Sequence, residues 1–124
     1  MITILTLLLL FLFQLKHFIV DFPLKGPYHY KNKGTYGHPG GIEHAGFHAI
    51  ATMMFLPFFA GFEVALWLSV FEFLFHYHLD WAKMRINAIK GWGPTTHEQF
   101  WWLLGADQAL HQSSYLVITA IALA

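Results

Sequence analysis

Four pairs of potential metal ligands recur along the sequence, and the two residues of each pair are four positions apart. The pairs are His17 and Asp21, His44 and His48, His76 and Asp80, and Asp107 and His111. Residues four apart on an α-helix project from the same face, one turn from each other. Each pair is therefore able to hold one metal ion, or two neighbouring ions, if its segment is helical.

The residue types limit which metals fit these pairs. The eight residues are five histidines and three aspartates, and the sequence contains no cysteine, so thiolate ligands and disulfides are excluded. Imidazole and carboxylate ligands suit zinc, iron and manganese. Because one zinc ion takes four ligands, eight residues suit two ions, or one ion with carboxylates that orient its histidines. We expect one or two divalent ions, with zinc preferred and iron or manganese as alternatives.

Each pair lies in a long apolar segment. Hydrophobic residues make up 56% of the 124-residue chain and charged residues only 11%, less than half the charged share usual in soluble domains. About 20 apolar residues are needed for a helix to cross a bilayer, and four segments qualify: residues 2–21, 42–60, 63–86 and 98–124. The sequence therefore predicts an all-α fold, an integral membrane four-helix up-down bundle in which residues 1–124 form a single transmembrane domain.

The positions of the pairs within these segments favour one shared site. The first and third pairs lie at the ends of their segments, and the second and fourth lie near the beginnings. In an up-down bundle these four places share one level. All seven basic residues fall on the same side of the bundle as this level: Lys16, Lys25, Lys31, Lys33, Lys83, Arg85 and Lys90. The positive-inside rule then predicts a multi-pass plasma (inner) membrane protein with both termini outside and the metal site near the cytoplasmic face.

Other polar residues continue the same helix faces, namely Gln14, Thr52, Ser69, Glu72, Ser114 and Tyr115. Glu72 fits a ligand, a partner of a ligand or a general base, and we take it as the candidate catalytic residue, with an aspartate free of metal as the other choice. We expect the other four histidines, His29, His38, His78 and His97, to lie at the surface or on other helix faces. Haem is disfavoured because the aspartates would then have no role.

The motifs that surround the pairs resemble a functionally uncharacterised family of small multi-pass membrane proteins of bacteria and phages. They read H-x-x-x-D-F at 17–22, H-x-x-x-H at 44–48, H-x-x-x-D-W at 76–81 and D-Q-x-x-H at 107–111, and they cover nearly the whole chain in order. This resemblance implies no activity. More loosely, histidines and aspartates on short helical spans are similar to those of bacterial membrane-bound metal-dependent hydrolases, an analogy of architecture.

Three functions fit this pattern. The leading hypothesis is a metal-dependent hydrolase that acts at the cytoplasmic membrane interface on a phosphoester or lipid-like substrate, whose phosphate would meet Lys16, Lys25, Lys83 and Arg85. The alternatives are a metal-stapled accessory subunit of a larger membrane complex and a di-iron membrane oxidase. The expected partners are the bilayer, this substrate, and a membrane protein or a second copy of the chain. A formal net charge of zero argues against nucleic acid.

Overall fold

The computed structural model describes residues 2–124, which consist of helices and the connections between them. The helices are α1 (Ile4–Asp21), α2 (Pro27–Tyr30), α3 (Pro39–Met53), α4 (Pro57–Ala60), α5 (Phe62–Lys90) and α6 (Glu98–Ala122). The prediction of an all-α fold is confirmed. The short helix α2 lies between the first two predicted segments, outside both of them.

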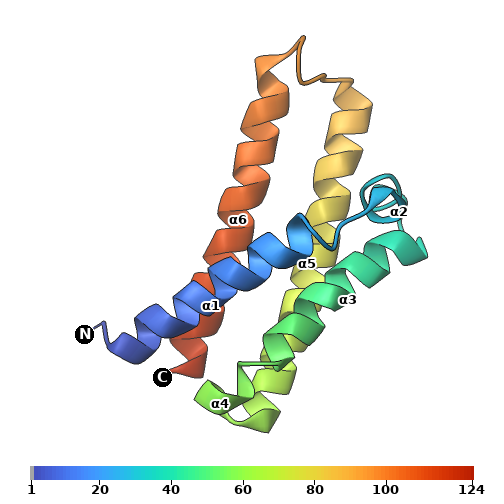
Figure 1. Ribbon diagram of the computed structural model, residues 1–124. Coiled ribbons are helices and arrows are strands. Elements are labelled where there is room, and N and C mark those ends of the chain that lie inside the picture. The colour runs from blue at the N-terminus through green and yellow to red at the C-terminus, as the bar shows by residue number, and fades with distance from the viewer. Residues whose placement is uncertain (1) are drawn as a thin grey trace.

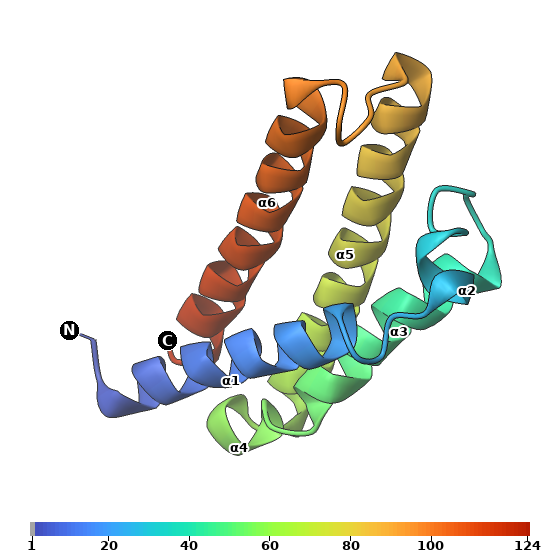
Figure 2. The ribbon, with the colours of Figure 1, turned by 45° about the horizontal axis from the view of Figure 1, so that its top comes forward.

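The four long helices form two antiparallel pairs that cross each other (Figures 1 and 2). Helices α5 and α6 make a long hairpin, and α1 and α3 run in opposite directions across it at an oblique angle. The two termini and α4 lie toward one end of the hairpin and the connection between α5 and α6 forms the other end, whereas α2 lies beside α5, part-way along it. Helix direction therefore alternates along the chain, although the four axes are not parallel.

The second predicted segment, residues 42–60, is two helices rather than one. Helix α3 ends at Met53, and α4 begins at Pro57. A proline has no backbone N–H, and its ring clashes with the carbonyl four residues earlier, here that of Met53. The chain then turns at Gly61, whose φ of 79° is in the left-handed region that glycine adopts readily, and enters α5 at Phe62.

Helix α1 is the one helix within residues 2–124 that is long and apolar enough to cross a membrane, judged by length and composition. Helix α3 has 15 residues, a length of about 22 Å at 1.5 Å per residue, which is shorter than a bilayer core of about 30 Å. Helices α5 and α6, with 29 and 25 residues, are long enough, but polar residues lower their mean hydropathy.

Side-chain burial is the reverse of that in a soluble domain. Among residues 2–124, 16 polar or charged residues are buried but only 11 hydrophobic ones, whereas 33 large hydrophobic side chains are exposed. The buried apolar residues gather near the termini and α4, where Phe13 stacks on Tyr115 with ring centroids 4.8 Å apart. The polar side chains fill the crossing between the two helix pairs.

The start of α3 passes close to the backbone before it, and this contact gives a testable prediction. A Cβ atom at Gly40 would lie 2.5 Å from the carbonyl oxygen of Tyr28. We expect Gly40→Ala to destabilise the fold by about 1–3 kcal/mol, the usual cost of overpacking. In the same helix, a Cβ at Gly46 would meet nothing nearer than 4.0 Å, so Gly46→Ala should stabilise by up to about 1 kcal/mol. Denaturant unfolding followed by circular dichroism measures both, and equal effects would contradict the contact.

Candidate metal centre

Six of the eight predicted ligands converge in two overlapping groups. The first group is Asp21, His44, His48 and His76, and the second is His76, Asp80 and His111. Within each group, one ligand atom per residue lies within 4.8 Å of all the others. All four long helices contribute, and none of the six residues is more than 6% exposed.

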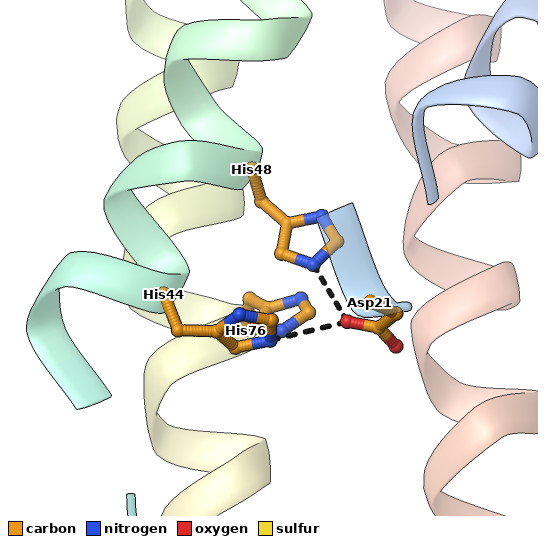
Figure 3. Close-up of side chains that lie close together, drawn as sticks. All are labelled: Asp21, His44, His48 and His76. Carbon is orange, nitrogen blue, oxygen red and sulfur yellow. Dashed lines mark hydrogen bonds and ion pairs between the residues drawn. The ribbon is translucent and has the colours of Figure 1, made fainter. Parts of the chain in front are cut away.

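The first group is arranged around the carboxylate at the end of α1 (Figure 3). The Oδ1 atom of Asp21 lies 2.9 Å from Nε2 of His48 and 3.1 Å from Nε2 of His44. These two histidines are one turn apart on α3. The ring of His76 approaches from α5, with its centroid 3.9 Å from that of His48. Three imidazoles and one carboxylate are a complete ligand set for tetrahedral zinc.

The second group uses the carboxylate of Asp80 in the same way. Its Oδ2 atom lies 3.1 Å from Nε2 of His76, and its Oδ1 atom lies 3.7 Å from Nε2 of His111 on α6. The Oδ2 atom is also 3.7 Å from Nε2 of His44, which belongs to the first group. The two groups therefore form one continuous centre in which His76 is shared.

Several ring nitrogens in this centre have no hydrogen-bond partner among residues 2–124. They are both nitrogens of His44, both nitrogens of His76, and Nε2 of His111. Carboxylate oxygens lie close to His44 and His76, but without the angles of a hydrogen bond. Buried polar atoms are rarely left unpaired. A cation bound at the Nε2 atoms, which face the carboxylates, would satisfy one nitrogen of each of these rings, so the donor set fits a metal ion.

The protonation of His111 is suited to metal binding. Its Nδ1 atom lies 2.8 Å from the backbone oxygen of Asp107. A carbonyl oxygen only accepts, so Nδ1 carries the proton and donates. In a neutral imidazole the other nitrogen, Nε2, then has its lone pair free, and Nε2 is the atom that faces Asp80.

His48 needs a proton shift before it can bind an ion. Its Nδ1 atom lies 3.1 Å from the ammonium of Lys16, which only donates. The neutral ring therefore carries its proton on Nε2 and donates it to Asp21. Metal binding at Nε2 would move this proton to Nδ1, and Lys16 would keep only its bonds to Glu72 and Tyr115.

The other two predicted ligands, His17 and Asp107, lie beside the centre and outside both groups. Nε2 of His17 is 3.1 Å from Oδ2 of Asp21, and its Nδ1 is 2.7 Å from the hydroxyl of Tyr115. Oδ2 of Asp107 accepts from Lys83 at 3.2 Å. His17 therefore fixes the position of Asp21, and Asp107 orients His111 through its backbone oxygen.

Glu72, the candidate base, is buried one turn before His76 on α5. Its Oε1 atom pairs with Lys16, and its Oε2 atom accepts from the hydroxyl of Thr52 at 2.5 Å. Both carboxylate oxygens are thus engaged. Of the other polar residues that continue the helix faces, Thr52, Ser69, Ser114 and Tyr115 are buried, whereas Gln14 is exposed.

The expectation that Lys16 meets a phosphate or headgroup at the interface is wrong, because Lys16 is only 5% exposed. It shares the buried face of α1 with Leu9, Phe13 and Val20, which lie at helical spacing. That spacing was the sequence signal for a buried Lys16, but the nearness of Lys16 to the end of the helix suggested a surface position. Its partner Glu72 compensates the cost of burying the ammonium.

Lys33 and His29 are also buried, and the surface position expected for His29 is wrong. Both belong to the segment around α2, which packs on α3. Nζ of Lys33 lies 3.6 Å from Oδ1 of Asp80, and Nε2 of His29 lies 3.2 Å from Oε1 of Glu43. The connection after α1 thus contributes directly to the surroundings of the centre.

The remaining three histidines lie away from the centre, as expected. His78 is exposed on another face of α5 and contacts the hydroxyl of Tyr36 at 2.9 Å. His38 caps the start of α3 by accepting from the backbone N–H of Gly40. His97 is exposed in the residue before α6.

Comparison with known proteins gives no family for this chain. No family model matches it, and no curated protein or solved structure is significantly similar to it. The resemblance to the uncharacterised membrane family therefore stays a prediction from the motifs.

Proposed function

We propose that the chain is an integral membrane protein whose four long helices lie in the bilayer. The reversed burial supports this, since exposed apolar side chains face lipid favourably and a polar interior is turned away from it. Six basic residues belong to the connection between α1 and α3 or to the C-terminal end of α5, away from the termini: Lys25, Lys31, Lys33, Lys83, Arg85 and Lys90. The positive-inside rule then orients that end, and the centre near it, toward the cytoplasm.

The centre, in this proposal, holds one divalent ion. Four carboxylates lie in or beside the centre, those of Asp21, Glu72, Asp80 and Asp107. Three of them already pair with a lysine: Glu72 with Lys16, Asp80 with Lys33 and Asp107 with Lys83. With neutral histidines, one negative charge is left. One divalent ion and one hydroxide neutralise the centre, whereas two ions would leave a surplus of positive charge in a buried site. This balance favours a single ion and disfavours the di-iron oxidase.

The activity we propose is metal-dependent hydrolysis of a phosphoester or lipid-like substrate. The observation that carries it is the second group, His76, Asp80 and His111, which offers three ligands and so leaves a position open, as in catalytic zinc sites. An ion bound there would lower the pKa of a water ligand and polarise the scissile group. Asp21 lies within 4.8 Å of His76. It replaces Glu72 as the preferred base because its oxygens contact imidazoles, which themselves exchange protons, whereas Glu72 pairs with the ammonium of Lys16.

Two aspartate variants test these roles against each other. We expect Asp80→Asn to lose the ion, because it removes a charged ligand. We expect Asp21→Asn to keep about one ion per chain, while kcat falls about 10²- to 10⁴-fold, the usual contribution of a general base. Elemental analysis of protein purified without added metal, and turnover of a panel of phosphomonoesters and phosphodiesters, measure the two effects. Chelation should abolish turnover of the unaltered protein, and Zn²⁺ should restore it.

A non-catalytic accessory subunit is the second candidate, and the first group favours it. Asp21, His44, His48 and His76 would supply all four ligands of a closed structural site. In that case Asp21→Asn would lose metal as readily as Asp80→Asn, or more readily. Cobalt-substituted protein would then also keep the same visible spectrum when azide is added, because no coordination position is open. These two results together would exclude the hydrolase.

A further inference from the structure

A second feature of the cytoplasmic end is a lysine-lined cavity beside the metal centre. It has a volume of about 260 Å³ and lies between α5, α6 and the connection that follows α1. The side chains of Lys25, Lys33 and Lys83 line it, together with Asn87 and apolar residues of α6, and no carboxylate lines it. The cavity is thus positively charged on one side and apolar on the other.

The three ammonium groups of this cavity differ in whether a carboxylate neutralises their charge. Lys33 pairs with Asp80 at 3.6 Å, and Lys83 pairs with Asp107 at 3.2 Å. Lys25 makes no ion pair with any residue in 2–124. Burial lowers the pKa of Lys25, the carboxylates of Asp21 and Asp80 raise it, and repulsion from the nearby charges of Lys33 and Lys83 lowers it further. An anion in the cavity would relieve this repulsion.

We propose that the cavity binds a phosphate group, in inorganic phosphate, a soluble phosphoester or a lipid headgroup. Three ammonium groups supply several donors for charge-assisted hydrogen bonds to phosphate oxygens, and the α6 side chains offer an apolar wall for the ester carbons. The volume suits a headgroup rather than a whole lipid. The inference rests on the proposed hydrolase for one point only, that the bound phosphate belongs to its substrate.

The same lysines connect the cavity to the metal centre. Lys33 contacts the ligand Asp80, and Lys83 contacts Asp107, whose backbone oxygen orients His111. An anion that draws these ammonium groups toward itself leaves the Asp80 carboxylate free to bind the ion. Since coupling between two binding sites is reciprocal, phosphate and metal should each strengthen the binding of the other.

The test uses the full chain in a neutral detergent, stripped of metal. In one arm, inorganic phosphate is titrated by calorimetry, and in the other, short-chain phosphatidic acid is compared with phosphatidylcholine of the same chain length. The variant is Lys25→Met, and the matched control is Lys31→Met, an exposed lysine in the same connection. We expect Lys25→Met to weaken binding roughly tenfold to hundredfold, the value of one charge-assisted hydrogen bond, and Lys31→Met to leave it within about twofold.

Each outcome decides the proposal. This pattern with inorganic phosphate supports a soluble ligand, and the same pattern with phosphatidic acid alone supports a lipid headgroup. If neither ligand binds the unaltered protein, or if both variants weaken binding equally, the cavity is not a phosphate site. Phosphate binding is measured on the metal-free protein and turnover on the metal-loaded protein, so the two results are independent. If phosphate binds but the metal-loaded protein shows no turnover, only the hydrolase proposal is overturned. Intact turnover with no phosphate binding would overturn only the cavity proposal.

Discussion

Replacement of His76 by alanine is expected to lower the affinity of the protein for Zn²⁺ by more than about a hundredfold. Loss of a residue that only supports a ligand commonly costs about 10- to 100-fold in metal affinity, and His76 is itself a candidate ligand in both groups. Its two buried nitrogens have no hydrogen-bond partner within residues 2–124, and the carboxylate nearest to its Nε2 atom belongs to Asp80, another candidate ligand. Competition with a chromophoric chelator measures the affinity, and elemental analysis measures the metal content.

His78→Ala is the matched control for this variant. His78 is two positions away on the same helix, but it is exposed and contacts Tyr36. Zinc affinity should be unchanged within about twofold, since a surface change far from a site rarely alters it. If both variants bind zinc equally well, the ion is not held at the crossing of the helix pairs, and the metal site is wrong as proposed.

The convergence of the ligands was predictable because it depends on local geometry. Spacing of four places His44 and His48 on one face of a helix, and the alternation of four helices brings that face to the level of Asp21 and Asp80. This reasoning needs no knowledge of crossing angles. It therefore held even though α1 and α3 cross the α5–α6 hairpin obliquely rather than lying parallel to it.

Which of the predicted residues are candidate ligands and which only support a ligand was not predictable in this way. His17 and His44 occupy equivalent places in their pairs, but His17 is bonded to Tyr115, whereas His44 has both nitrogens free of hydrogen bonds. That difference depends on which side chains face each ring across the helix crossing. The positions of Lys16 and Lys33 depend on the same packing, since their partners Glu72 and Asp80 are 56 and 47 positions away along the chain.

The second large effect is expected at Glu72. Glu72→Leu leaves the ammonium of Lys16 buried without its carboxylate partner. Removing one member of a buried ion pair typically destabilises a protein by about 3–5 kcal/mol, and denaturant unfolding should show a loss of this size. The control is Glu63→Leu, a change at the exposed start of the same helix, for which we expect less than about 0.5 kcal/mol.

The double variant Lys16→Met with Glu72→Leu separates the contribution of this ion pair to stability from a role of Glu72 in the reaction. It removes both charges, so most of the lost stability should return, as apolar replacement of buried ion pairs is often neutral or stabilising. Zinc content should also stay at about one ion, because neither residue belongs to a ligand group. If the double variant is stable and metal-loaded but has lost turnover, Glu72 takes part in the reaction, and the preference for Asp21 as the base is wrong. If turnover persists, the buried pair serves the fold alone, and Asp21 keeps its proposed role.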